Sequence, residues 1–397
     1  MSIQVFMDGT NLSDPMQTGF STRRFSGLSN AEFVIPTAQA SGGIGSKMKV
    51  VVNGELEHHG RVLHVSDELK EDTMYTTFQS WMPLEIVRFR PARDGAASPT
   101  PGNLITPSVF KRVQFGPEII AEMLGQSEED SDPNLGEGPL GFVVGTVETG
   151  GSNVSGAPTN FPMTISECIS LLVSTGELDV VETPIDSGGN MSSVGLHNGG
   201  YGVDRSGEVV FNYAMGLNNC VMRQIEDGHN MCNKLYYNFG PRPSTTRYKA
   251  NITADDPCLP AGPLGTVISR RDASRASYGV RMDFREFDVG VLRTEDHGDE
   301  GGECNEPQDE TRILYRRRWL QESFYRAIPR RMVHITPQRN YALTAFGVGD
   351  LIGAQAGAAA RGGFGFQKQR VYERTVAWDS DVAWLNEIGA SPNYEGL

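Results

Sequence analysis

Between residues 31 and 91 apolar and polar positions alternate with the two-residue period of a half-buried strand. β-branched and aromatic residues gather in four runs, 31–36, 47–65, 74–81 and 84–91. The dipeptide Asn53-Gly54 interrupts the second run. Asn-Gly is the strongest short-range hairpin signal, because a tight turn needs positive φ at both of its central residues. Roughly five strands in about sixty residues is a spacing typical of barrels and sandwiches, so the pattern predicts a β-barrel.

The alternation also predicts which side chains of the second hairpin strand share a face. Leu56, His58, Val62 and His64 would point the same way, and Gly60 is well placed to form a bulge. The histidine between them in sequence, at position 59, would point to the opposite face. Only two of the three histidines could then converge on a metal ion, so we interpret them as barrel histidines.

A linker and a short helix follow the barrel pattern. Residues 92–108 are rich in Pro, Gly, Ala and Ser, which is typical of a linker. The next stretch predicts a helix over 117–124, with Pro117 in its first turn and Gly125 as its C-cap. Its apolar stripe consists of Ile119, Ile120, Met123 and Leu124.

Residues 139–220 predict strands around one further helix. The helix has one apolar face, formed by Ile165, Cys168, Ile169 and Leu172, and after a Gly-containing turn a strand begins with Leu178, Val180 and Val181. The alternation predicts further strands over 207–216, 233–240 and 331–337.

The C-terminal region predicts two hairpins. Residues 341–357 read as a strand, a turn at Gly349-Asp350 and another strand, and residues 370–391 read as a hairpin with its turn at 379–381. The glycines at 347–353 begin like a dinucleotide-binding fingerprint. The last glycine falls one residue late and no βαβ unit surrounds it, so a hairpin turn is the better interpretation.

Charge is segregated between residues 295 and 339. The segment 295–310 holds eight acidic residues and no Lys or Arg, whereas 312–339 holds eight arginines and one acid. The first segment reads as a solvated loop or as a loose site for a hard cation. The second predicts a helix over 309–327 with Asp309 as N-cap, ending before Pro329.

The arginines allow three interpretations. They could form an exposed helix face, contact the phosphates of passing DNA, or pair with acidic side chains of a neighbouring subunit, since guanidinium groups match carboxylates in a bidentate geometry. The candidate subunit-interface residues are Arg316, Arg317, Arg318, Arg330 and Arg331.

Composition narrows the function classes. A chain of 397 residues suggests two to four modules, and 46 glycines favour a turn-rich β protein. The formal net charge of −14 argues against sequence-specific nucleic-acid binding, although DNA could still pass along an acidic wall. We expect no membrane span and no signal peptide. The five cysteines are scattered without a CxxC pair, which favours reduced, mostly buried thiols.

Enzyme and metal templates do not fit the chain. No GxSxG elbow, HExxH pair or Walker loop occurs. The acidic loop from Asp130 resembles a calcium loop, but Leu135 and Gly141 stand where an EF-hand needs Gly and Glu. We therefore predict no catalytic residue, no cofactor and no metal site.

The order of these elements carries a resemblance. It comprises a strand ending in Ile35-Pro36, an Asn-Gly-Glu hairpin with Gly60-Arg61-Val62, a Tyr-containing strand, and a strand ending in Arg90-Pro91. This order resembles the hub and minor tail proteins of long-tailed (siphovirus-type) phages, which sit between tail tube and tail tip. The Asn-initiated strand at 233–240 and the glycine-rich pair at 347–353 are similar to segments of the same family.

The resemblance implies a strand-rich α+β fold with two tail-tube-like β-barrel domains flanking inserted α/β inner domains. Residues 1–96 would form the N-terminal barrel, 97–335 the inserted inner hub domains, and 336–397 a second, barrel-completing β segment.

The resemblance also implies a structural virion protein of the tail tip, made in the host cytoplasm. It would form a homo-oligomeric ring, most often a trimer, and contact the distal tail ring, the tape measure protein and tip or fibre proteins. DNA would pass through its channel. A tail-associated cell-wall hydrolase and the hub of a bacterial contractile injection system are the alternatives.

Overall fold

A computed structural model of the chain describes residues 3–12, 17–90, 114–129, 140–150, 153–154, 164–174, 178–213, 218–229, 231–239, 265–270, 272–287, 327–338, 342–343, 345–357, 364–380 and 382–392. Strands dominate these ranges, and the predicted strand-rich α+β class is confirmed.

The strands of the N-terminal region are β1 (Ile3–Met7), β2 (Thr10–Asn11), β3 (Thr18–Arg24), β4 (Asn30–Pro36), β5 (Lys47–Val52), β6 (Glu55–Lys70) and β7 (Thr73–Trp81). The middle region contains β8 (Gln114–Phe115), β9 (Phe142–Val147), β10 (Asn153–Val154), β11 (Asp179–Ser187), β12 (Asn190–His197), β13 (Val210–Tyr213), β14 (Cys220–Asp227), β15 (Lys234–Phe239), β16 (Gly265–Arg270) and β17 (Met282–Phe287). The last strands are β18 (Arg330–Pro337), β19 (Leu351–Ala356), β20 (Phe364–Asp379) and β21 (Val382–Ser391). The helices are α1 (Gly116–Glu129), α2 (Ile165–Ser174) and α3 (Asp272–Tyr278), with short 3₁₀ turns η1 (Thr37–Gln39) and η2 (Pro83–Arg88).

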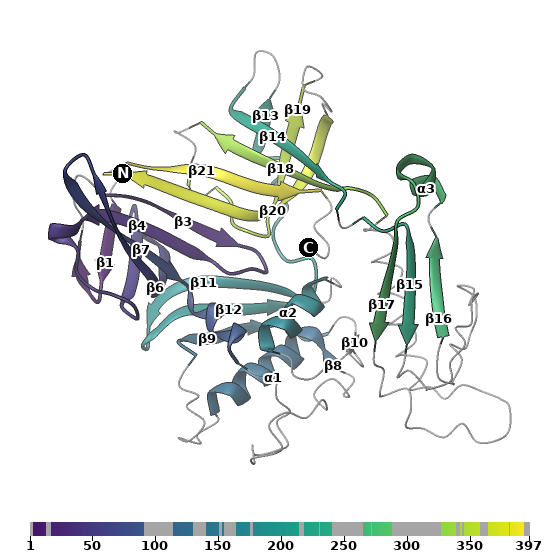
Figure 1. Ribbon diagram of the computed structural model, residues 1–397, viewed down its shortest axis with the longest axis horizontal. Coiled ribbons are helices and arrows are strands. Elements are labelled where there is room, and N and C mark those ends of the chain that lie inside the picture. The colour runs from purple at the N-terminus through teal and green to yellow at the C-terminus, as the bar shows by residue number, and fades with distance from the viewer. Residues whose placement is uncertain are drawn as a thin grey trace.

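One large sheet joins the two ends of the chain (Figure 1). Its main path runs β14-β18-β21-β20-β3-β4-β7-β6-β5-β1-β2, and β19 extends it from β20 to β13. Side chains from strands far apart on this path, such as Val5 and Cys220, belong to the same buried core. The sheet must therefore curl around that core.

Among the described strands the large sheet is open, and the predicted closed barrel over residues 1–96 is not found. Closure would require the free edge of β3 to pair with the β1–β2 end of the same segment. That edge instead pairs antiparallel with β20, from Thr18↔Asp379 to Arg24↔Glu373. The same pairing unites the segments 1–96 and 336–397 in one sheet, and the boundaries drawn between them stay predictions.

The Asn53-Gly54 hairpin forms as predicted, but the face assignment along its second strand is wrong in part. Both turn residues have positive φ, at 54° and 84°. Register shifts on β6 at Glu57 and at Leu63 exchange its faces. Glu57 is consequently buried together with His58, whereas His64 is exposed. Gly60 is no bulge; it lies against the Trp81 carbonyl, where a Cβ would come within 2.1 Å.

The run 84–91 was expected to be a strand, but it begins as the 3₁₀ turn η2. Pro83 opens the turn, and a proline at the first position of a helical turn has preset φ and lacks only an N–H that would be unpaired anyway. The apolar side chains Leu84 and Val87 are three residues apart and are both buried against the second core. This three-residue spacing is that of a helical turn, which explains why the run forms η2 and not a strand.

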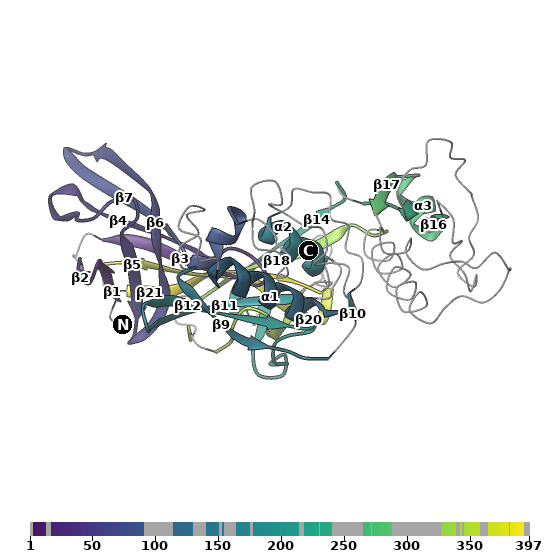
Figure 2. The ribbon, with the colours of Figure 1, turned by 90° about the horizontal axis from the view of Figure 1, so that it is seen from below.

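A second layer packs beneath the large sheet (Figures 1 and 2). It is the three-stranded sheet β11-β12-β9 with α1 and α2 against it, and it has its own apolar core. The predicted stripes of both helices are buried in that core. A capping box starts α2: Thr164 and Glu167 each accept the other's backbone N–H, at 3.2 and 2.6 Å. Gly125 lies inside α1, so its prediction as C-cap is wrong.

A third sheet, β16-β15-β17, carries α3 and stands to one side of the other layers in Figure 1. The predicted strands at 207–216, 233–240 and 331–337 correspond to β13, β15 and β18.

The predicted C-terminal hairpin is β20–β21, and Ser380 in its turn has a φ of 54°. In the preceding pair, the strand after Gly349 exists as β19, whereas the described residues before it form no strand. The predicted linker over 92–108, the acidic run 295–310 and nearly all of the predicted helix 309–327 lie outside the described residues.

Candidate functional site

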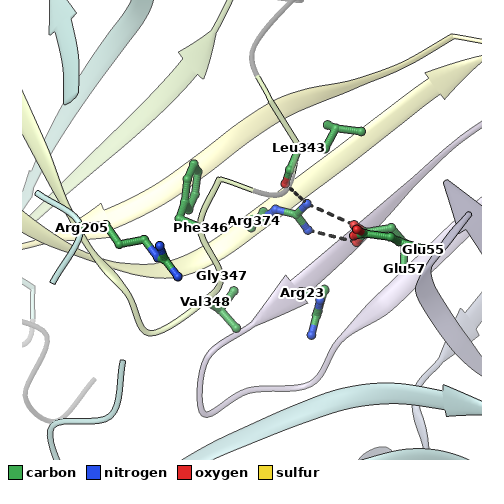
Figure 3. Close-up of a pocket in the computed structure, with 9 residues that line it drawn as sticks. All are labelled: Arg23, Glu55, Glu57, Arg205, Leu343, Phe346, Gly347, Val348 and Arg374. Atoms are coloured by element: carbon green, nitrogen blue, oxygen red, sulfur yellow. Dashed lines mark hydrogen bonds and ion pairs between the residues drawn. The ribbon is translucent and has the colours of Figure 1, made fainter. Parts of the chain in front are cut away.

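A charged pocket of about 230 Å³ lies where the N-terminal and C-terminal strands meet (Figure 3). Its lining residues come from β3, β6 and β20 and from the segments that precede β13 and β19: Arg23, Glu55, Glu57, Arg205, Leu343, Phe346, Gly347, Val348 and Arg374. None of the charged residues in this set was predicted from the sequence as a site residue.

The centre of the pocket is a buried ion pair between β20 and β6. Arg374 donates from both terminal nitrogens to the two carboxylate oxygens of Glu57, at 3.0 and 3.1 Å (Figure 3). It also donates to the carbonyl of Leu343. The two side chains are only 4% and 6% exposed. A bidentate ion pair that is shielded from water fixes the relative position of its two side chains, so it holds β20, near the end of the chain, against β6, near its beginning.

A second arginine lies next to this pair and has no ion pair of its own with a carboxylate of the described residues. Arg23 on β3 is directly opposite Arg374 in the antiparallel register. Its Nε is buried and has no hydrogen-bond partner among the described residues. Burial lowers the pKa of the Arg23 guanidinium below its ordinary value, and the nearby Glu57 charge only partly offsets this.

The wall of the pocket is held by Asp350. Its carboxylate accepts from Arg205 at 3.0 Å and from the backbone N–H groups of Val203 and Gly347, each at 2.9 Å. Phe346 packs edge to face on Phe211, with ring centroids 6.1 Å apart. These contacts fix the loop before β19 against the segment before β13.

Buried titratable groups continue from the pocket into the layer below it. Glu182 on β11 accepts from Ser192 at 2.7 Å and from the backbone N–H of Leu84 at 2.9 Å. Burial raises the pKa of Glu182 to about 7, although these bonds and the Arg23 charge favour the ionised form. Burial likewise lowers the pKa of His58 to about 3, so this ring is neutral at physiological pH.

The lining of the pocket consists of charged and apolar groups. Its lining contains three arginines and two glutamates, with no Ser, Thr, Cys, His or Lys that could act as a nucleophile. In the described part of the chain no group of three His, Cys, Asp or Glu side chains is arranged to hold a metal ion. His58 bonds Ser80 at 2.9 Å and His59 bonds the Ile185 carbonyl at 2.7 Å, so both rings serve structural contacts.

The predicted interface arginines are only partly within the described residues. Arg316, Arg317 and Arg318 lie outside them. Arg330 and Arg331 begin β18 and are exposed, opposite Asp227 and Glu226 of β14. Arg331 bonds Glu226 at 2.9 Å, so its carboxylate partner comes from its own chain. Arg330 and Arg331 are not among the residues that line the pocket.

Three of the cysteines, Cys168, Cys220 and Cys232, are described, and all three are buried. Burial raises the pKa of the Cys168 and Cys220 thiols to about 12, which makes them poor nucleophiles. Of the helices that the structure describes, none is long and apolar enough to cross a membrane.

The large curled sheet and the layer beneath it form a layered β scaffold that contains the pocket. Known structures have a similar fold. The chain is similar to the 43 kDa tail protein of prophage MuSo2 from Shewanella oneidensis, with a TM-score of 0.56 and 14% identity over 100% of both chains. It is also similar to a tail protein from Neisseria meningitidis MC58, with a TM-score of 0.58 and 8% identity over 100% of this chain and 97% of the other. At these identities the likeness shows a common fold. No protein-family model matches the sequence, and no curated protein matches it.

Proposed function

We propose that the protein is a structural component of a phage tail and serves as a hub at the tail tip. The observation that carries the proposal is the common fold, which extends over the whole chain and over nearly all of two tail proteins. The pocket supports it, since its buried ion pair stabilises a scaffold and its lining contains no Ser, Thr, Cys, His or Lys. The protein would bind and gate, without making or breaking covalent bonds.

A ring of copies, most simply a trimer, would use the curled sheet as its wall. The main path of the sheet ends at β2 and β14, and an open edge strand is a template for unwanted pairing unless a neighbour covers it. Ring closure by identical copies covers such edges. Residues 1–96 and 336–397 would form the wall together, and 97–335 would supply the inner domains.

The charge of the chain suits a conduit for DNA. Each copy carries a formal charge of −14, and an acidic wall lets a polyanion slide, whereas a basic wall would bind its phosphates. The arginines of the segment 312–339 would then face away from the channel, toward acidic surfaces of the distal tail ring, the tape measure protein or tip and fibre proteins.

Electron microscopy of particles tests the proposal. Gold-labelled antibody against the chain should mark the distal end of the tail in particles released by the host. Loss of the gene should leave particles with an incomplete tip. Label on the head or along the tail shaft, or particles without the protein, would overturn the tip assignment. Release of soluble fragments from host cell walls by the purified protein would favour a hydrolase instead.

A further inference from the structure

The β6–β7 hairpin extends beyond the sheet to which it belongs. β5 accompanies β6 only as far as Arg61, and β4 accompanies β7 only between Tyr75 and Trp81. Residues 64–68 of β6 pair with residues of β7 that β4 also accompanies, and only residues 69–74 extend past both neighbours as a two-stranded ribbon. We call residues 63–74 the tip, and it lies at one end of the molecule (Figure 2). A ribbon of two strands is marginally stable by itself in water, so a partner surface would stabilise it.

The tip combines apolar and acidic side chains. Leu63, Leu69 and Met74 are 44%, 63% and 45% exposed. The same segment contains four acids, Asp67, Glu68, Glu71 and Asp72, against the single cation Lys70. An apolar surface with an excess of negative charge requires a partner surface that is both apolar and basic.

Such a surface lies where the ends of α3, β18 and β20 come together. A groove of about 440 Å³ is lined there by Tyr278, Ile328, Pro329, Arg331, Gln367, Lys368 and Pro392. Tyr278 and Ile328 are 46% and 42% exposed, and the lining has two cations and no acid. We call this surface the groove.

The two cations of the groove remain available to a partner. Arg331 pairs with Glu226 and Lys368 with Asp204, but all four side chains are about half exposed. Ion pairs this exposed contribute little, typically ~1 kcal/mol or less, so an incoming carboxylate can join or replace the existing partner.

We propose that the tip of one copy docks in the groove of a second copy, which makes a head-to-tail contact. Leu69 and Met74 would cover Tyr278 and Ile328, while the acids of the tip meet Arg331 and Lys368. Two copies of charge −14 repel each other at long range, so a contact between them needs local complementarity of this kind. Head-to-tail contacts close into rings when the rotation permits. The inference rests on the proposed ring and names its surfaces.

Mixing two defective variants tests the contact, with native mass spectrometry at about ten micromolar protein as the measurement. The tip variant is Glu68→Lys with Leu69→Ser, and the groove variant is Arg331→Ser with Lys368→Ser. We expect the wild-type chain to be oligomeric and each variant to be monomeric at this concentration. The dissociation constant of the contact should rise at least tenfold in each variant. The mixture should give dimers, because the intact tip of the groove variant fits the intact groove of the tip variant.

Val382→Ser is the matched control, since it removes an exposed apolar side chain, 55% exposed, at the other long hairpin. It should keep the wild-type mass. A monomeric wild-type chain, a tip or groove variant with wild-type mass, or a mixture without dimers would overturn the contact. None of these results would move the antibody label on the tail, so failure of the contact is distinguishable from failure of the tail assignment.

Discussion

The buried pair of Glu57 and Arg374 joins side chains that are 317 positions apart in sequence. We expect Glu57→Gln to lower the free energy of unfolding by about 3–5 kcal/mol, because it leaves Arg374 buried beside Arg23 without a counter-charge. Urea denaturation followed by circular dichroism measures the change. The partly exposed pair of Arg24 and Glu373, with side chains 41% and 24% exposed, connects β3 and β20 and is the control: Glu373→Gln should cost less, about 1 kcal/mol. Equal losses in the two variants would contradict this account of the pocket.

Glu182 should make stability depend on pH in a defined window. Its pKa is raised to about 7 in the folded state from 4.5, so the folded chain holds an extra proton between these values. The contribution of Glu182 is therefore most favourable below pH 4.5 and falls until pH 7, by about 3 kcal/mol in total.

His58 acts in the opposite direction in part of that window, since its lowered pKa removes stability as the pH falls below 6.5. The informative quantity is therefore the difference in unfolding free energy between wild type and Glu182→Gln, measured from pH 4 to pH 8. We expect the variant to gain stability relative to wild type as the pH rises. A difference that stays constant with pH would show that Glu182 does not titrate in this range.

At the scale of elements, β6 depends on the close approach of Gly60 to the end of β7. A Cβ at this position would lie 2.1 Å from the carbonyl oxygen of Trp81 and 2.8 Å from the His58 ring. We expect Gly60→Ala to destabilise the fold by at least about 1–3 kcal/mol, as overpacking of a rigid backbone contact does. Gly43→Ala is the control, because nothing lies within 4 Å of its Cβ position. Thermal unfolding of both variants measures the effect, and equal melting temperatures would contradict it.

Local signals were enough to predict the turns and the amphipathic helices. The Asn53-Gly54 turn and the turn after Asp379 depend on a few adjacent residues. The helical stripe of α2 likewise depends on spacing within ten residues. The run after Pro83 was ambiguous, since a short apolar segment can satisfy either a strand or one helical turn.

The charged pocket could not be predicted, because it depends on contacts between distant strands. Simple alternation places Glu57 on the face opposite His58, and only the register shift in β6 brings it inside. Arg374 and Arg23 meet because β20 pairs with β3, and no local pattern encodes that pairing. The only signal for the pocket in the sequence was that each of these strands contains a charged residue. Charged residues are common on the exposed faces of strands, so this signal could not identify a buried pocket.

At the scale of the whole molecule, the first and last strands form one structure. β3 and β20 pair over seven positions, and Trp378 packs so closely on Gly19 that a Cβ there would lie 2.5 Å from the indole ring. The apolar core of the large sheet takes side chains from both ends of the chain. The segment 336–397 would therefore be a part of the N-terminal domain, since it supplies both a paired strand and core side chains.

We accordingly expect residues 1–96, expressed alone, to be unable to fold as a stable monomer. The edge of β3 would be unpaired, and Glu57 would be left without Arg374, so the fragment should aggregate or lack a cooperative unfolding transition. Co-expression with residues 336–397 should restore a soluble complex, because that segment supplies β20 and β21. Gel filtration and thermal unfolding of the two preparations measure this. A fragment 1–96 that unfolds cooperatively as a monomer would show that its strands close without β20, and would support an independent N-terminal barrel.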